Sequence, residues 1–311
     1  MTDPASGGGD PDPLFRSGFV TLVGRPNVGK STLLNHLIGT KVSIVSDRPQ
    51  TTRNQIRGVR TTPGSQIVFL DTPGIHKPRT MLGERTNDRA ISTFDEVDLI
   101  CLLIEANRPI GPGDRFIANL IHRSRTPKLL LVNKIDVAEK EQVFDHLAVA
   151  TDALGVFDAY IPVSGRTGEH TDVLIEEVLA RLPVGPRYYP EGEVTDQPET
   201  FIAAEIVREK LLTVARDELP HSITVTVEEI EPGDDDEPRP DLLSLRAVVR
   251  VERDSQKGIV IGKGGAVLKA AGTQARQELE ALFGTKVFLE TFVKVDKDWQ
   301  RRSHALDRLG F

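Results

Sequence analysis

Between residues 19 and 182, short apolar runs alternate with stretches in which apolar residues recur at helical spacing. The apolar runs are bounded by turn residues, which predicts β-strands at 19–23, 67–70, 99–104, 128–132 and 159–163. The run at 99–104 lacks polar alternation, as is typical of a parallel strand buried on both faces. Helical spacing at 31–38 and 173–182 predicts helices. The pattern therefore predicts a doubly wound, mostly parallel α/β sheet with its site at the carboxyl ends of the strands.

The pattern changes after residue 182. Residues 183–200 are rich in Pro and Gly and have no sustained periodicity, which indicates a linker. Beyond it we expect a helix with an apolar stripe at Ala203, Val207, Leu211 and Val214, and strands at 223–227, 245–251 and 287–295. The expected segments are a disordered tail at 1–17, a first domain at 18–182, a linker at 183–198 and a smaller α+β domain at 199–311. The acidic loop at 231–238 is expected to be a solvated hairpin tip.

Residues 24–31 read Gly-Arg-Pro-Asn-Val-Gly-Lys-Ser and match the G-x-x-x-x-G-K-[ST] pattern of a phosphate-binding loop. The glycines let backbone N–H groups point at a phosphate chain, and the helix after the loop adds its positive N-terminus. Lys30 would meet the terminal phosphates, and the Ser31 hydroxyl would coordinate Mg²⁺. A chance glycine-rich turn is the alternative, which the strand before and the helix after disfavour. The expected nucleotide contacts are Gly24, Arg25, Pro26, Asn27, Val28, Gly29, Lys30, Ser31 and Thr32.

Two segments further along carry residues that suit the same phosphate chain. Residues 41–57 lack periodicity, so we expect a loop, in which Thr52 is favoured over Thr51 as a second hydroxyl ligand of Mg²⁺. The alternative is that both are solvated loop threonines. The strand at 67–70 leads into the motif Asp-Thr-Pro-Gly at 71–74. Asp71 would hold the water shell of Mg²⁺, and Gly74 would offer its N–H to the γ-phosphate. The expected nucleotide contacts here are Asp71, Thr72, Pro73, Gly74 and the next residue, Ile75.

The strands at 128–132 and 159–163 end in motifs suited to a purine base. Asp136 can accept from both N1–H and the exocyclic amine of guanine, whereas adenine would leave it unpaired. The Asn133 side chain can bridge the base and the loop that holds the base, and the apolar stem of Lys134 can lie on the face of the base. Backbone N–H groups of the last motif could meet the guanine carbonyl, and surface turns are the alternative. The two motifs comprise Asn133, Lys134, Ile135 and Asp136, then Ser164, Gly165 and Arg166.

The second domain contains a candidate nucleic-acid loop. Gly262, Lys263, Gly264 and Gly265 fit the G-x-x-G loop that clamps a single-stranded backbone in KH domains, and an apolar run precedes them and a helix follows. Lys257 and Lys269 are expected to add phosphate contacts. Residues 253–302 hold ten Lys or Arg against six Asp or Glu, a balance of +4 within a chain of −7. The net charge disfavours indiscriminate polyanion binding, so a basic face would be confined to this domain.

Together these motifs resemble the Era family of ribosome-associated GTPases, with Gln-Thr-Thr-Arg at 50–53 and Asp-Thr-Pro-Gly at 71–74 joined to a type II KH domain. The resemblance implies a P-loop GTPase that binds GTP or GDP with Mg²⁺ and acts in small ribosomal subunit assembly. Its implied RNA partner is the 3′ end of the small-subunit ribosomal RNA. It also implies catalytic roles for Lys30, Asn27, Thr52 and Gly74, with Asn27 helping to hold a K⁺ ion at the phosphates.

Two departures from related GTPases bear on activity. Gly165 stands where alanine is usual, which matters little because that contact is through the backbone. Ile75 follows Gly74 where Ras-like proteins carry a glutamine that orients the attacking water, so we expect slow intrinsic turnover. The Era-like group shares this second departure.

Composition narrows the remaining alternatives. Cys101 is the single cysteine, which excludes an internal disulfide and fits a reducing, cytoplasmic setting. No apolar stretch approaches the ~20 residues that span a bilayer, so membrane contact would be peripheral at most. We expect a monomer. The rival function is an interaction protein with GTP as a structural ligand and a KH-like module that docks on protein. An ATP-using P-loop enzyme is opposed by the motif at 133–136.

Overall fold

The computed structural model describes residues 14–46, 52–76, 78, 80–215, 223–232 and 242–311. The expected tail up to residue 13, Thr51 and most of the acidic loop lie outside these described residues. Among the residues inside them, no helix has the length and apolar character needed to cross a membrane.

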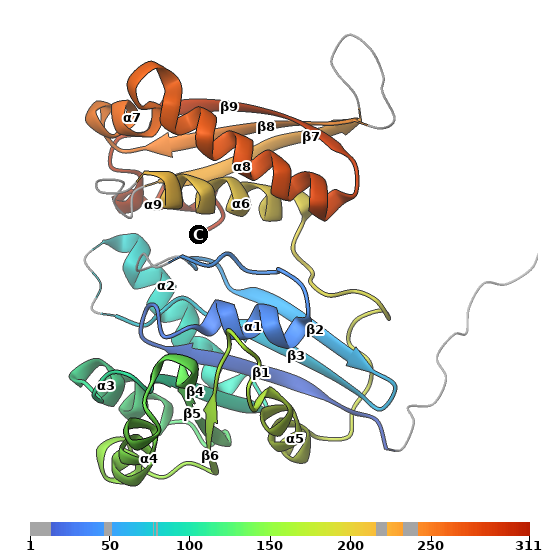
Figure 1. Cartoon of the computed structure of the whole chain (residues 1–311), viewed down its shortest axis with the longest axis vertical. Coiled ribbons are helices and arrows are strands. Elements are labelled where there is room, and N and C mark those ends of the chain that lie inside the picture. The colour runs from blue at the N-terminus through green and yellow to red at the C-terminus, as the bar shows by residue number, and fades with distance from the viewer. Residues whose placement is uncertain (1–13, 47–51, 77, 79, 216–222, 233–241) are drawn as a thin grey trace, which may run out of the picture.

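The first unit is a six-stranded sheet in the order β2-β3-β1-β4-β5-β6, with helices on both faces (Figure 1). Neighbouring strands are parallel except β2, which runs antiparallel to β3. The doubly wound, mostly parallel sheet is therefore confirmed. Its elements are β1 (Arg16–Gly24), α1 (Lys30–Ile38), β2 (Ile56–Thr62), β3 (Ser65–Asp71), α2 (Met81–Ser92), η1 (Thr93–Asp95), β4 (Leu99–Glu105), α3 (Pro112–Ile121), β5 (Lys128–Asn133), η2 (Ile135–Val137), α4 (Lys140–Leu154), β6 (Ala159–Val163) and α5 (Thr171–Arg181).

Two apolar cores hold this sheet between its helices. Leu33 of α1 and Leu174 of α5 belong to one core, and Ile117 of α3 and Ala150 of α4 belong to the other. Residues 99–105 of β4 are buried throughout, as expected for a strand covered on both faces. The five parallel strands end along one edge, where the predicted motifs follow them.

Two expectations about the ends of segments were wrong. The tail was placed at 1–17, but β1 begins at Arg16 and Phe15 is only 4% exposed. The Phe15 ring lies 5.0 Å from the Arg187 guanidinium, and the Phe15 backbone carbonyl accepts from the Gly185 N–H. The linker therefore folds back over Phe15. The loop at 41–57 was drawn too long, because β2 starts at Ile56. The pattern of β2 is hard to read because it is a mixed-polarity edge strand whose partner, β3, decides its conformation.

The second unit is a three-stranded sheet in the order β7-β8-β9 with helices packed on one face (Figure 1). β7 is antiparallel to β8, and β9 is parallel to β8 after a two-helix crossover. Its core includes Val207 of α6, Val249 of β8 and Ala275 of α8. The elements are α6 (Glu199–Val214), β7 (Thr224–Pro232), β8 (Leu242–Val251), α7 (Asp254–Ile261), η3 (Lys263–Gly265), α8 (Ala266–Phe283), β9 (Lys286–Val295), η4 (Trp299–Arg301) and α9 (Ser303–Arg308).

The linker packs along the first unit. The Val59 N–H of β2 donates to the Val194 carbonyl at 2.8 Å, and Arg57 pairs with Asp196 at 2.6 Å. The linker therefore covers the edge strand β2.

The chain end after β9 packs against α2 of the first unit. Trp299 is fully buried in a small cluster with Leu82 of α2 and Leu306 of α9. Arg85 of α2 donates to Asp307 at 2.6 Å and to the Phe311 carbonyl at 3.0 Å. Trp299 thus joins the two units.

Candidate functional site

The loop between β1 and α1 has the backbone shape of a phosphate cradle. Asn27 and Gly29 have φ values of 64° and 96°, and Gly29 directly precedes the first turn of α1. A Cβ built on Gly29 would lie 2.4 Å from Asn133 Nδ2, so only glycine fits there. The loop therefore places the N-terminus of α1 and several backbone N–H groups against one space.

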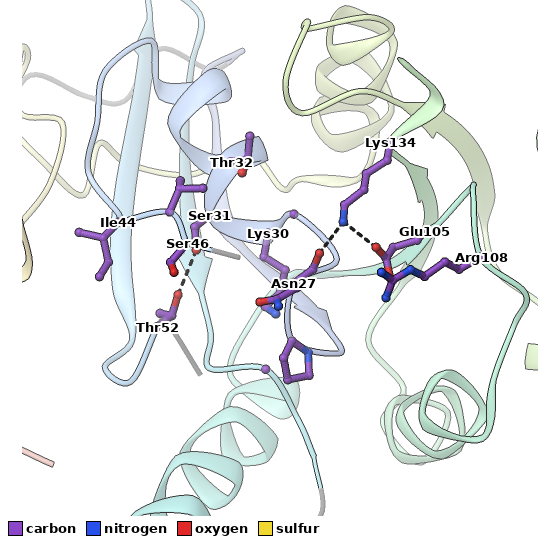
Figure 2. Close-up of a pocket in the computed structure, with 14 residues that line it drawn as sticks. Asn27, Lys30, Ser31, Thr32, Ile44, Ser46, Thr52, Glu105, Arg108 and Lys134 are labelled. Atoms are coloured by element: carbon purple, nitrogen blue, oxygen red, sulfur yellow. Dashed lines mark hydrogen bonds and ion pairs between the residues drawn. The ribbon is translucent and has the colours of Figure 1, made fainter. Parts of the chain in front are cut away.

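That space is a cavity of about 340 Å³ (Figure 2). Its lining is Pro26, Asn27, Gly29, Lys30, Ser31, Thr32, Ile44, Val45, Ser46, Thr52, Gly74, Glu105, Arg108 and Lys134. Lys30 Nζ donates to the carbonyl oxygens of Gly24 and Arg25 at 3.3 and 3.2 Å. Burial lowers the pKa of Lys30 to about 8, against the attraction of Asp71. Because a polyanion in the cavity would offset this burial cost, Lys30 is suited to receive negative charge.

Oxygen ligands converge on one side of the cavity. Ser31 Oγ lies 3.0 Å from Thr52 Oγ1 (Figure 2). It also donates to Asp71 Oδ2 at 2.6 Å. Ser43 Oγ also donates to Asp71 Oδ2, at 3.0 Å. Asp71 Oδ1 is buried and has no hydrogen-bond partner among the residues that the structure describes. Burial raises the pKa of Asp71, although Lys30 and the three hydroxyls oppose this. An unpaired buried carboxylate oxygen beside hydroxyls fits a hard cation such as Mg²⁺.

The motif after β3 approaches the phosphate loop through its backbone. A Cβ on Gly74 would lie 2.8 Å from the Pro26 nitrogen, and the Ile75 N–H donates to the Gly24 carbonyl at 3.3 Å. The Ile75 side chain is 2% exposed and packs in the apolar core, so it is directed away from the cavity. The Thr72 hydroxyl donates to the Leu22 carbonyl, so this side chain supports β1. Pro73 lines a separate, much smaller pocket beside α2.

The motifs after β5 and β6 are tied to the phosphate loop by Asn133. Its Nδ2 donates to the Val28 carbonyl at 2.8 Å, and its Oδ1 accepts from the Gly165 N–H at 3.0 Å. Asp136 accepts from Ser164 Oγ at 2.7 Å and pairs with Arg166 at 2.6 Å. A carboxylate has about four acceptor sites, so Asp136 keeps capacity for two more donors.

The glycine-rich loop of the second unit is exposed beside a second hollow. Gly262, Gly264 and Gly265 have φ values of 73°, 61° and 80°, which suit glycine, and Lys263 is exposed. The run before the loop is helical, since α7 continues to Ile261. A groove of about 360 Å³ follows the loop, lined by Gly265, Leu268, Lys269, Gly272, Thr273, Arg276, Leu289 and Thr291. Lys269 therefore lies on the groove, whereas Lys257 lies on α7, half-buried.

Each of the two units matches a model of a known protein family. Residues 19–134 match the family model described as 50S ribosome-binding GTPase, and residues 218–300 match the KH domain model. GTPase Era of Mycobacterium sp. (strain JLS) is 52% identical over 299 residues, which cover 96% of this chain and 99% of that protein. GTPase Era of Mycobacterium tuberculosis (strain ATCC 25177 / H37Ra) is 51% identical over 300 residues, with the same coverage. The chain belongs to the Era family of GTPases.

Solved Era structures match most of the chain. A single-residue variant of Aquifex aeolicus Era bound to GDP·AlF4⁻ matches with a TM-score of 0.91 at 40% identity, covering 95% of this chain and 99% of that one. Era in complex with MgGDPNP and nucleotides 1506–1542 of 16S ribosomal RNA matches with the same TM-score, identity and coverage. The resemblance suggested by the motifs is therefore confirmed, and the chain is a GTPase of this family.

Some residues of this Era-family site were missed by sequence reasoning. Glu105 ends β4, is 3% exposed, and accepts from Lys134 Nζ at 2.5 Å, while Lys134 also donates to the Asn27 carbonyl at 2.7 Å (Figure 2). An acidic residue directly after the predicted buried strand was the available signal. Arg108 and Ser43 lay in stretches without a motif. Arg25 was expected to bind nucleotide, but its side chain pairs with Asp114 at 2.7 Å and it is not among the residues that line the cavity.

Proposed function

We propose that this GTPase binds single-stranded RNA at the 3′ end of the small-subunit ribosomal RNA and acts in small ribosomal subunit assembly. The observation that carries this proposal is the 360 Å³ groove beside the exposed loop at 262–265. Small residues there let a nucleic acid backbone approach closely, and Lys263 and Lys269 offer charge to phosphate. The related Era structure with a 16S ribosomal RNA fragment supports the choice of RNA.

At the nucleotide end, the backbone of residues 24–32 would cradle the phosphates and Lys30 would pair with the terminal ones. Ser31, Thr52 and Asp71 would hold Mg²⁺, with Asp71 acting through water. When bound, Mg²⁺ supplies positive charge that offsets charge developing on the phosphoryl oxygens.

At the base end, Asn133 positions the phosphate loop and the last base loop together, and Asp136 would accept from guanine. Gly74 would offer its N–H to the γ-phosphate. Ile135 and Arg166 are proposed to complete the base site.

Contacts between the nucleotide loop and the second unit support control of RNA binding by the nucleotide. The Val45 N–H, which lies at the cavity, donates to Glu209 of α6 at 2.8 Å. Arg53, the residue after Thr52, donates to the Ile223 carbonyl beside β7 at 2.6 Å. A change at the γ-phosphate that moved this loop would therefore also act on α6 and β7.

A variant of the glycine loop tests RNA binding. Lys263→Asp with Gly264→Asp places negative charge where phosphates must approach. A Cβ at Gly264 meets open space, and the strain of a side chain at its φ of 61° is smaller for aspartate than for most residues. We expect RNA affinity to fall about tenfold or more, because charge-assisted hydrogen bonds are lost. GTP binding should be unchanged. Equilibrium binding to single-stranded and duplex RNA at fixed salt measures this, and the single strand should bind better.

The control is Lys297→Asp, which reverses the charge of one exposed lysine outside the groove just as Lys263→Asp does inside it. It should bind RNA much like the parent, since only general electrostatics change. If the folded loop variant bound single-stranded RNA as the parent does, the KH unit would not be the RNA-binding element. The protein-docking function would then take its place.

We further propose that K⁺, held partly by Asn27, offsets the lack of a water-orienting side chain at Ile75. The observations that support this are the core position of Ile75 and the place of Asn27 on the cavity. Replacing K⁺ with Na⁺ at constant ionic strength should slow GTP turnover, and Asn27→Gly should remove the difference. Glycine suits this test because Asn27 has φ of 64°, where alanine would add strain. Equal rates in both salts would exclude the ion.

Domain limits and setting complete the proposal. The limits 18–182, 183–198 and 199–311 are supported by the separate cores of the two sheets, with the first limit moved back to Arg16. We propose that the chain acts as a monomer in the cytoplasm, where small ribosomal subunits are assembled, with at most peripheral membrane contact. Lys257 is proposed as an auxiliary RNA contact from α7.

A further inference from the structure

The second sheet has an outer face opposite its helices. Along β9, Val287, Leu289 and Val293 pack in the core beneath the helices, so the alternating residues point the other way. Two of these are Phe288 and Phe292, whose exposed fractions are 45% and 44%. Because these rings stay nearly half exposed, much of their apolar surface gains nothing from folding, and a pair of them on one face points to a role at the surface.

Basic side chains surround the two rings. Arg246, on the neighbouring strand β8, lies with its guanidinium 5.9 Å from the Phe292 ring centre and pairs with Glu290 at 3.5 Å. Lys286 and Lys294 are exposed and lie on the same face of β9, one before Phe288 and the other after Phe292. The outer face of β9 and its neighbour Arg246 thus hold three positive charges against the one negative charge of Glu290. Aromatic rings interleaved with Arg and Lys suit nucleic acid bases and phosphates.

This outer face is continuous with the groove described above. Leu289 and Thr291 of β9 line the groove on the helix side, while Phe288 and Phe292 alternate with them on the other side. β9 is an edge strand, because the sheet order is β7-β8-β9. A strand of RNA that leaves the groove across this edge would therefore meet the two rings directly.

We propose that the outer face of β9 is a second single-stranded RNA site, where bases downstream or upstream of those in the groove stack on Phe288 and Phe292. This inference rests on the proposed RNA-binding function. Phe288 and Phe292 lie about 13 Å apart along the strand. Glu290 separates them, so they form two stacking positions rather than one continuous apolar patch. Such an arrangement, with its positive surroundings, fits RNA better than an apolar protein surface.

The test compares a four-nucleotide and a twelve-nucleotide single-stranded RNA of one sequence type, using the full chain with a non-hydrolysable GTP analogue. The short RNA fills only the groove, since a KH loop clamps about four nucleotides. We expect the parent to bind the long RNA more tightly. Phe288→Ala with Phe292→Ala should weaken binding of the long RNA at least about fivefold and leave the short RNA unchanged.

Two control variants separate stacking from other effects. Phe288→Leu with Phe292→Leu keeps apolar cover without an aromatic face, so it should lose affinity for the long RNA as the alanine pair does. Phe116→Ala with Phe144→Ala removes two exposed phenylalanines from the first unit and should bind both RNAs like the parent. Circular dichroism establishes that each variant is folded.

The outcomes distinguish this inference from the proposed function. Equal binding of the long RNA by the parent and the alanine pair would overturn the second site while leaving the groove intact. Full affinity in the leucine pair would also overturn it, because the rings would then act only as apolar cover. Failure of the parent to bind either RNA would instead refute the proposed function, and the second site with it.

Discussion

We propose that selectivity for guanine depends on how Asp136 is held. Ser164 and Arg166 each bind one of its oxygens, and Asn133 joins the same loop to the phosphate cradle. These contacts orient the carboxylate before a base arrives, so little reorganisation is needed on binding. A site built in this way rejects a base that cannot supply two donors, because the carboxylate would be left unpaired.

Asp136→Asn is expected to change nucleotide preference. The amide can accept at only one oxygen and presents N–H groups to the N1–H and amine of guanine, so GTP affinity should fall at least about 100-fold. Xanthosine triphosphate, which carries a carbonyl in place of the amine, should bind the variant better than GTP does. Competition binding with both nucleotides measures this, and Asp172→Asn, at an exposed position of α5, is the control. Unchanged GTP affinity would show that Asp136 does not read the base.

At the scale of elements, α6 holds the loop between α1 and β2. Glu209 of α6 is 5% exposed and accepts from the Val45 N–H and from Lys41 Nζ at 2.8 and 2.6 Å. Arg53, further along the loop, is buried against Trp299 with its guanidinium 5.7 Å from the ring. Burial is the main reason that the pKa of Arg53 is lowered to about 9, with nearby Arg208 adding to it. The loop that lines the nucleotide cavity is thus anchored in the second unit.

Glu209→Ala should uncouple the loop from α6. It leaves the Val45 N–H without its acceptor and Lys41 with one carboxylate fewer, which should lower the free energy of unfolding by about 1–3 kcal/mol. The ratio of RNA affinities with a GTP analogue and with GDP should move toward one. Glu199→Ala, an exposed change on the same helix, is the control and should leave that ratio as in the parent. A ratio unaffected by Glu209→Ala would place the coupling elsewhere.

At the scale of the whole molecule, charged contacts join the two units at separate places. Glu278 of α8 pairs with Lys41 of the first unit and with Lys210 of α6. Burial alone would raise the pKa of Glu278, but hydrogen bonds from Lys210 and Lys41 outweigh it, so the net pKa is below its usual value. A carboxylate with a depressed pKa stabilises the folded state above its unfolded pKa, and this stabilisation is lost as pH falls through the folded pKa.

Glu278→Gln therefore gives a pH-dependent loss of stability. At pH 7 the variant should unfold with a free energy about 1 kcal/mol below that of the parent, since the pair is partly exposed. The difference should shrink as pH falls below about 4.5, where the parent also loses the charge. Urea unfolding followed by fluorescence of the single tryptophan, the buried Trp299, reports on the joined units. A difference that stayed constant with pH would show that Glu278 contributes through packing alone.

Much of the candidate site could be predicted from the sequence because its chemistry is local. The phosphate loop needs glycine at positions with positive φ and a lysine next to the helix start, and these requirements are written in consecutive residues. The motifs at Asp71 and Asn133 follow buried strands, and parallel strands bring their carboxyl ends to one edge. The α/β class follows from the same alternation of apolar runs and helices.

Only the tertiary structure decided which distant residues complete the site. Ser43 binds Asp71, and Glu105 binds Lys134, across the fold. In the sequence, Ser43 and Glu105 each lie in a stretch without a motif of its own. The burial of Trp299 against α2 and the exposure of Phe288 and Phe292 are likewise not determined by hydrophobicity. An aromatic residue can satisfy the same pattern inside a core, at an interface or on an open sheet face. The neighbours that distinguish these places are set by packing between units that are far apart in the chain.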